Sequence, residues 1–411
     1  MRINRAIHRW AFLYSLALLG VACAGAEEAA NQDYLALWVA SADSTQPDFL
    51  AVLDVTANAE RYGDVVTTLP VPGLRNGPHH TEHEMPASAQ LFANGFGAGK
   101  TWVFDLQEPR TPRIAAAFED FEGYTHPHSF LRLPNGNVLA TYQMRHVNGD
   151  MQPGGLVEIT DAGARVRSSS AFGPGIAKDH RVYSAQILPA LDRIVTTSTD
   201  MHDAGGVESS RLIQVWRLSD LALLHSFPLP PGPLGDEGDY TAEPRVMADG
   251  RTVLVSTFNC GLYLMDGIEG DAPSARFVAS FPKKPDTYCA IPVIIGHYYL
   301  VTVPAWSAVV VLDIADPAAP REVGRMALGD DDVPHWIAAS PDGSRIVVTG
   351  YGAMRNRVVL ADFDTLTGAL TLDSRFRDAG AESPGVRLDN KSWPHGGTAA
   401  GVPHGAVFTR R

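Results

Sequence analysis

The sequence has few cysteines, no cluster of basic residues and, after its N-terminal segment, no long apolar run. Only 3 of 411 residues are cysteine, which excludes a framework of many disulfides. Lysine and arginine number 33 against 46 aspartates and glutamates, a formal net charge of −13. This acidity argues against nucleic acid and anionic membrane surfaces as partners. We expect no membrane insertion of the mature chain and a small molecule as the partner.

Residues 1–26 have the features of a signal peptide. Three arginines form a basic start: Arg2, Arg5 and Arg9. Residues 11–22 are apolar but too short to span a bilayer comfortably, and small residues then offer cleavage sites up to Ala26. Cys23 would also permit a lipoprotein anchor, but Gly20 stands where such a signal usually has leucine. We therefore predict export of residues 27–411 to the periplasm or the exterior.

A repeat of about 50 residues runs through the mature chain. Its marker is a short β-rich run, mostly closed by aspartate, at residues 48–54, 101–105, 156–161, 212–216, 262–266, 309–313 and 358–362. A turn and another β-rich run follow each marker. A strand pair precedes it, joined in places by an Asn-Gly or Asp-Gly turn. Four strands per unit and seven units predict an all-β fold, a single seven-bladed β-propeller. A sandwich would fit the composition but not the period.

The two ends of the mature chain predict how the ring closes. Residues 34–40 read as a second strand with no first strand before them. Gly405–Phe408, at the other end, can supply the missing innermost strand of blade one. We therefore expect N- and C-terminal segments to pair within one blade.

Histidine is concentrated directly behind proline. Five of 14 histidines follow a proline, whereas 29 prolines in 411 residues predict about one such pair by chance. Imidazole is the commonest protein metal ligand and the usual acid or base near neutral pH. Residues just before the innermost strand of each blade should converge at the mouth of the channel, as ligands of one site must.

Each blade offers a candidate ligand at this position. They are His79, His80 and His83 (blade two), His126 and His128 (three), His180 (four), Glu243 (five), Cys289 (six), His335 (seven), and His404 with His395 nearby (one). In blade two the innermost strand is expected at residues 88–92. A polar loop would explain His83 and Glu84 equally well, and Cys260 and Cys289 could form a disulfide, provide a thiolate ligand or remain buried thiols, with the disulfide favoured.

These positions predict a metal site with acid or base groups beside it. The predicted metal ligands are His79, His80, His126, His128, His335, His395 and His404. The predicted catalytic residues are Glu84, His180 and Glu243. Several imidazoles with a carboxylate or thiolate suit copper, zinc or non-haem iron.

Short motifs across most of the mature chain resemble the selenium-binding protein family, whose bacterial members include methanethiol oxidases. They lie at residues 48–55, 69–74, 103–113, 125–129, 311–321, 340–345 and 362–370, together with the His79–His80 pair. The resemblance implies a seven-bladed propeller, copper held by histidines, and oxidation of a thiol by dioxygen.

Individual residues match this family unequally. His79 and His80 match its histidine pair. His126 and His128 lie where the family has two histidines three residues apart, and His395 lies near a C-terminal histidine that precedes a glycine-rich stretch. The two histidines His335 and His404 have no clear counterpart. The family's Cys-x-x-Cys after the pair is absent, and residues 84–89 stand in its place, so the chain is expected to be a divergent member.

Three functions are compatible with these patterns. The first is an exported copper-dependent oxidoreductase acting on a small thiol such as methanethiol. The second is a non-catalytic binding propeller that uses the aromatic residues Trp306, Trp336 and Trp393. The third is a metal-assisted hydrolase or lactonase with Glu82, Glu84 or Glu243 as base.

Overall fold

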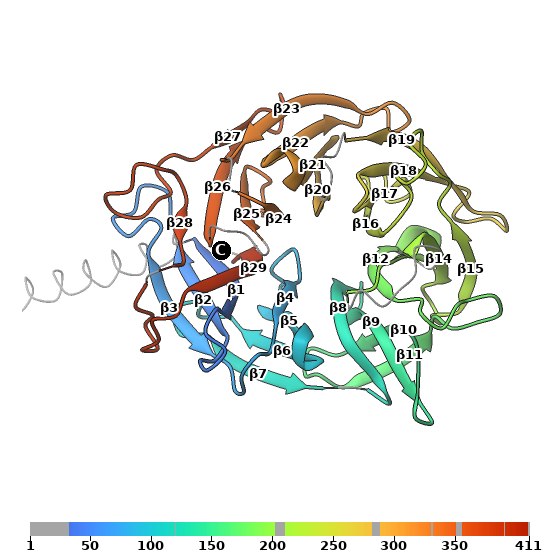
Figure 1. Ribbon diagram of the computed structural model, residues 1–411, viewed down its shortest axis with the longest axis horizontal. Coiled ribbons are helices and arrows are strands. Elements are labelled where there is room, and N and C mark those ends of the chain that lie inside the picture. The colour runs from blue at the N-terminus through green and yellow to red at the C-terminus, as the bar shows by residue number, and fades with distance from the viewer. Residues whose placement is uncertain are drawn as a thin grey trace, which may run out of the picture.

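The computed structural model describes residues 33–119, 121–201, 210–281, 288–329, 332–350, 356–389 and 391–409. The predicted signal peptide and Cys23 lie outside these ranges. Seven sheets stand around a central axis, each with its first strand innermost (Figure 1). The predicted seven-bladed β-propeller is therefore confirmed. No helix in these ranges is long and apolar enough to cross a membrane.

The strands of the first four blades follow the predicted repeat. Blade one contains β29 (Gly401–Phe408), β1 (Tyr34–Ser41), β2 (Phe49–Asp54) and β3 (Val65–Pro70). Blade two contains β4 (Pro78–Thr81), β5 (Gln90–Gly95), β6 (Lys100–Asp105) and β7 (Arg113–Phe118). Blade three contains β8 (Tyr124–Arg132), β9 (Val138–Val147), β10 (Asp150–Ile159) and β11 (Arg165–Ser170). Blade four contains β12 (Val182–Leu188), β13 (Arg193–Ser198), β14 (Leu212–Arg217) and β15 (Leu223–Pro228).

The remaining three blades complete the ring. Blade five contains β16 (Thr241–Val246), β17 (Val253–Thr257), β18 (Gly261–Asp266) and β19 (Ser274–Ser280). Blade six contains β20 (Pro292–Ile295), β21 (Tyr298–Val303), β22 (Ala308–Asp313) and β23 (Arg321–Ala327). Blade seven contains β24 (Pro334–Ala339), β25 (Arg345–Gly350), β26 (Arg357–Phe363) and β27 (Leu370–Leu372), with β28 (Val386–Arg387) also paired to β26.

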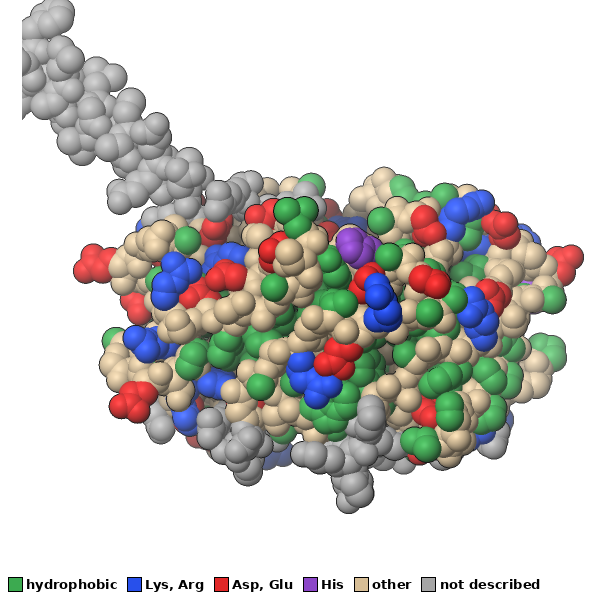
Figure 2. Space-filling model, turned by 90° about the horizontal axis from the view of Figure 1, so that it is seen from above, with side chains coloured by type: hydrophobic (Ala, Val, Ile, Leu, Met, Phe, Trp, Pro, Cys, Tyr) green, Lys and Arg blue, Asp and Glu red, His purple; other side chains and the backbone are tan. Residues whose placement is uncertain are grey.

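The repeated aspartate closes the third strand of several blades. Asp105 Oδ1 accepts a hydrogen bond from the Gln107 amide at 3.0 Å, which tightens the turn into the fourth strand. Its Oδ2 also pairs with Arg113 of β7 at 2.7 Å. Blade six repeats the pattern at Asp313 and Arg321. With such pairs, acidic and basic side chains are interspersed on the outer surface of the propeller (Figure 2).

The apolar core lies between neighbouring blades. All six residues of β2 are buried, whereas β7 alternates exposed and half-buried residues. One hydrophobic cluster of buried side chains joins Trp336 and Val347 of blade seven to Leu37 and Ala51 of blade one. Inner strands are therefore held by the packing of adjacent sheets, and the polar channel face is left for function.

Ring closure follows the prediction, with a longer strand than expected. The C-terminal strand β29 runs antiparallel to β1 and comprises eight residues, Gly401–Phe408, so it includes His404 itself. The two cysteines Cys260 and Cys289 form a disulfide, as favoured from the sequence, and join blade five to the segment before blade six. Cys289 is therefore not a free thiolate ligand.

The innermost strand of blade two differs from its prediction. It is the four-residue β4, Pro78–Thr81, which carries the histidine pair within it. The run expected at residues 88–92 instead leads into the second strand, β5. A strand made of proline, two histidines and threonine has no apolar alternation, so the sequence pattern did not reveal it.

Candidate metal centre

The candidate histidines are carried by irregular inner strands. Pairing between the inner and second strands shifts register in every described blade except the sixth. In β4 the shift falls between Pro78 and Thr81, across the histidine pair. Side chains alternate between the faces of a regular strand, but a bulge redirects them. The adjacent His79 and His80 can therefore stack, with ring centroids 4.3 Å apart and planes 6° from parallel.

Second-strand side chains fix the backbone that carries the histidines. Each donates a hydrogen bond to a main-chain carbonyl in the inner strand of the next blade. The bonds are Asn94 Nδ2 to Pro127 O (2.8 Å), Thr141 Oγ1 to Tyr183 O (2.8 Å), Thr302 Oγ1 to His335 O (2.7 Å) and Thr349 Oγ1 to His404 O (2.6 Å). These buried bonds couple neighbouring blades and hold the inner strands in register.

Five histidines from four blades converge on the axis. This histidine cluster comprises His79, His80, His128, His335 and His404. His79 lies 4.1 Å from His404 and 5.1 Å from His128, between ring centroids. His335 lies 4.8 Å from His404 by the same measure. Every member is buried, with at most 4% of its surface exposed.

The donor set fits a transition metal. One candidate ligand nitrogen each from His79, His80 and His404 lie within 4.8 Å of one another. The Nε2 atoms of His80 and His128 are buried and have no hydrogen-bond partner among the described residues. An imidazole nitrogen left in this state needs a compensating ligand, which a metal provides. The cluster therefore can hold a metal, with His79, His80 and His404 as its nearest group of donors.

Burial keeps these imidazoles neutral. It lowers the pKa of His335 to about 3 and that of His128 to about 3. For His79, His80 and His404, burial is the main cause of a pKa well below the ordinary value, and neighbouring histidines lower it further. A neutral ring keeps a lone pair for metal binding.

An aromatic shell surrounds the cluster, and the sequence did not reveal it as part of a site. Tyr183 lies 3.9 Å from His128 and Trp336 lies 4.9 Å from His80, between ring centroids. Phe96 lies 5.9 Å from His79, and Tyr288 lies 5.9 Å from His335. The sequence signal that could have indicated these aromatic residues was their position, since Tyr183 and Trp336 lie on inner strands. The shell makes the surroundings of the cluster apolar.

Three predicted histidines lie outside the cluster. His126 has a φ of +60°, which turns it aside, and its ring lies 5.5 Å from Phe96. His180 lies before β12, where its Nε2 is 3.2 Å from Gln214 Oε1 on the third strand. His395 contacts Thr68 Oγ1 of the outer strand β3 at 2.8 Å from its Nδ1. The structure does not bring these three to the five-membered group.

The predicted acidic residues lie elsewhere on the channel wall. Glu82 is buried and forms a two-point ion pair with Arg132, at 2.6 and 3.0 Å. Glu84 is exposed in the loop after β4. Glu243 lies on β16, where its Oε2 accepts hydrogen bonds from Arg245 Nη1 at 2.6 Å and from Ser184 Oγ at 2.7 Å. Trp336 and Trp393, suggested above as partner-binding aromatics, are buried.

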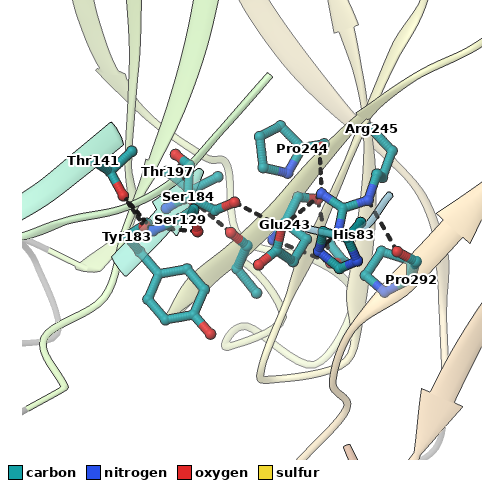
Figure 3. A network of polar contacts seen from close by, with 12 residues as sticks. His83, Ser129, Thr141, Tyr183, Ser184, Thr197, Glu243, Pro244, Arg245 and Pro292 are labelled. Carbon is teal, nitrogen blue, oxygen red and sulfur yellow. Dashed lines mark hydrogen bonds and ion pairs between the residues drawn. The ribbon is translucent and has the colours of Figure 1, made fainter. Parts of the chain in front are cut away.

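Arg245 and His83 form a polar contact across the channel, beside Glu243 (Figure 3). Arg245 Nη2 reaches from blade five to His83 Nε2 in blade two, at 3.0 Å. The guanidinium donates, so His83 accepts and is neutral, and burial followed by the charge of Arg245 holds the pKa of His83 well below its ordinary value. His83 stacks on Trp336 at 4.1 Å, and Trp336 in turn lies against His80.

Comparisons with known proteins agree with this architecture. No protein-family model matches the chain. A methanethiol oxidase from Hyphomicrobium sp. is 30% identical over 173 residues, which is 41% of this chain and 39% of that protein. The chain thus matches less than half the length of this curated relative. The family resemblance predicted from the motifs is confirmed by this match.

Solved structures share the propeller fold. A hypothetical selenium-binding protein from Sulfolobus tokodaii has a TM-score of 0.72 at 16% identity, over 92% of this chain and 93% of that one. A periplasmic gluconolactonase from Pseudomonas aeruginosa has a TM-score of 0.62 at 13% identity, over 92% of this chain and 99% of that one. At these identities, the likeness establishes the fold.

Proposed function

We propose that this protein, which resembles the selenium-binding proteins and methanethiol oxidases, is an exported copper-dependent oxidoreductase that oxidises a small thiol. The observation that carries the proposal is the convergence of five buried, neutral histidines from four blades. His79, His80 and His404 would hold the metal, and His128 and His335 stand ready to complete or support the shell. Zinc and iron are the alternative metals.

Copper, when bound, would supply the electron transfer between thiol and dioxygen. The chain's own residues would do the rest. The overall reaction balances as methanethiol, dioxygen and water giving formaldehyde, hydrogen sulfide and hydrogen peroxide. The inner strands hold the imidazoles in fixed positions, so little reorganisation is needed on metal binding. Phe96, Tyr183 and Trp336 offer apolar walls suited to a methyl group and keep bulk water out.

The activity is tested with metal-loaded mature protein and methanethiol. We expect peroxide and sulfide to be released together, in equal amounts. His80→Ala should abolish both, because it removes a buried donor of the triad. His146→Ala is the matched control, since His146 is exposed on β9. Turnover that survives His80→Ala unchanged would contradict the assignment.

Export belongs to the same proposal. The pairing of Cys260 with Cys289 supports it, because disulfides persist mainly in oxidising compartments. Fractionation of cells expressing the full chain should recover a shortened protein in the periplasm or medium. A full-length protein retained in the cytoplasm would contradict export.

A further inference from the structure

A large chamber with a mixed polar and apolar lining adjoins His83 and Arg245. Its volume is about 880 Å³, and it is lined by the ends of inner strands from blades two to seven and by Phe408 of β29. Pockets of roughly 300–1,000 Å³ typically hold ligands of drug or sugar size. Methanethiol has only two heavy atoms, so the proposed oxidase substrate gives no reason for a chamber of this size.

Within the described ranges, Glu243 presents a buried carboxylate oxygen without a partner at the chamber wall. It is only 1% exposed and lines the chamber. Its Oε2 is used by Arg245 and Ser184, but Oε1 is buried and has no hydrogen-bond partner among the described residues. A buried carboxylate oxygen left in this way is costly, so a donor is expected there.

Arg245 provides the complementary group beside it. Its Nε bonds to Pro292 O at 2.9 Å, and its Nη1 bonds to Glu243. The Nη2 atom has two N–H groups, of which His83 takes one. Acceptor and donor thus stand side by side on one wall. A ligand hydroxyl can both donate and accept a hydrogen bond. Two neighbouring hydroxyls could therefore donate to Glu243 and accept from Arg245 at the same time.

The charges around the chamber narrow the class of ligand. Four carboxylates face two guanidinium groups along its walls, a formal charge of −2: Glu82, Glu84, Asp161 and Glu243 against Arg132 and Arg245. This excess disfavours anions. The Glu243–Arg245 pair is itself neutral, so nothing there selects for a cation. Phe130 and Phe408 add apolar surface that can face the C–H side of a sugar ring.

We infer that this chamber is a second binding site, which takes a neutral, hydroxyl-rich small molecule of sugar size through Glu243 and Arg245. The chamber adjoins the histidine cluster through Ser129 and His83, but none of the five cluster histidines lines it, so its ligand groups differ from those of the metal site. It does not depend on the thiol oxidase proposal.

Three pyranoses of one skeleton test the class directly by ligand-observed NMR titration. D-glucose is neutral, D-glucosamine is cationic and D-glucuronate is anionic. We expect saturable glucose binding in the millimolar range, with glucuronate at least about tenfold weaker and glucosamine no tighter than glucose. Absence of saturable glucose binding would overturn the inference. So would glucosamine or glucuronate binding about tenfold more tightly than glucose.

Variants locate the binding within the chamber. Glu243→Gln should weaken glucose binding about tenfold or more, because it replaces a charged acceptor. The control Glu322→Gln removes an exposed carboxylate on the outer strand β23 and should change nothing. If Glu243→Gln fails to fold, Gln186→Phe fills the chamber from its half-buried wall and should also block glucose. Unchanged glucose binding in a folded variant of either kind would overturn the site.

A reciprocal variant separates the two sites. His80→Ala should lose metal and keep glucose binding within about twofold, since it does not line the chamber. Loss of glucose binding in a folded His80→Ala protein would contradict a separate site. Metal-free wild-type protein that binds glucose would leave the second site standing even if the oxidase proposal failed.

Discussion

Five imidazoles packed together make the neutral ring the stable form at the histidine cluster. Protonating any one of them would place a charge in a buried site, beside other imidazole rings. Desolvation is therefore the first cause of every lowered pKa in the cluster. The same feature that prepares the rings for a metal makes the metal-free protein sensitive to acid.

The first prediction concerns this acid sensitivity. Between pH 6.5 and about 3, the unfolded chain protonates His335 and the folded protein does not. The stabilisation is complete above pH 6.5 and is lost as the pH falls. His335→Asn should therefore reduce the pH slope of the unfolding free energy by up to about 1.4 kcal/mol per pH unit. Denaturant titrations of metal-free protein from pH 7 to 5 measure it.

The control for this experiment is His146→Asn, because His146 is exposed on β9. Its slope should equal that of the parent protein. An unchanged slope in His335→Asn would show that His335 is not buried in the neutral form.

A second prediction concerns Ser129, which orients one ring of the cluster. Ser129 Oγ lies 3.1 Å from His128 Nδ1 and donates to Tyr183 O at 3.4 Å. Its lone pair thus favours a proton on Nδ1 and leaves the Nε2 lone pair for a metal. Ser129→Ala should weaken metal affinity about tenfold, measured by competition with a chelator. Ser129→Thr keeps the hydroxyl and should retain affinity; equal affinity in both variants would exclude this role.

At the scale of elements, β29 both closes the ring and carries a ligand. Its backbone pairs with β1, and Ala406 O accepts a hydrogen bond from Trp336 Nε1 at 2.9 Å. Thr349 of β25 holds His404 O from the other side. Removing this one strand therefore disturbs the contacts between blades seven, one and two together.

The third prediction is that deleting residues 401–411 causes aggregation and loss of metal together. The deletion leaves an open edge on β1 and removes His404. Size-exclusion chromatography and metal analysis measure the two effects. His404→Ala, which keeps the strand, should lose metal but remain the same size in solution. A truncated protein that keeps its size, melting temperature and metal content would refute this closure.

The fourth prediction concerns the disulfide that joins blades five and six. Cys260 and Cys289 are 29 residues apart, so the bond restricts a loop of moderate length in the unfolded chain. Its loss should lower the unfolding free energy by roughly 3 kcal/mol. Urea titration with and without reductant measures this. The double variant Cys260→Ser/Cys289→Ser should no longer respond to reductant, and identical midpoints for oxidised and reduced wild type would contradict the expectation.

The sequence predicted the strands and blades more readily than the directions in which the histidine side chains point. Repeated aspartates and hairpin turns predicted the blades because they act locally. The four-residue strand at His79 and His80 was missed because its residues have no apolar pattern. In a regular strand, His126 and His128 would point to the same face. The positive φ at His126 instead turns its side chain away from that of His128. Bulges and tertiary contacts set these directions, and spacing alone cannot report them.

At the scale of the whole molecule, the propeller brings distant segments to one axis. His79 and His404 are 325 residues apart in the chain, yet their rings are neighbours. Along the same channel, the histidine cluster lies among aromatic rings, whereas the neighbouring chamber carries the Glu243–Arg245 pair. One fold can thus offer two chemically different candidate sites, because the inner strands of different blades bring different side chains to the same channel.

The central claim is that the histidine cluster binds a metal, and metal analysis of purified mature protein after copper loading tests it most directly. We predict about one equivalent of copper per chain, lost in His80→Ala and in His404→Ala and retained in His146→Ala. Substoichiometric copper, iron and zinc alike in the folded wild-type protein would contradict the account.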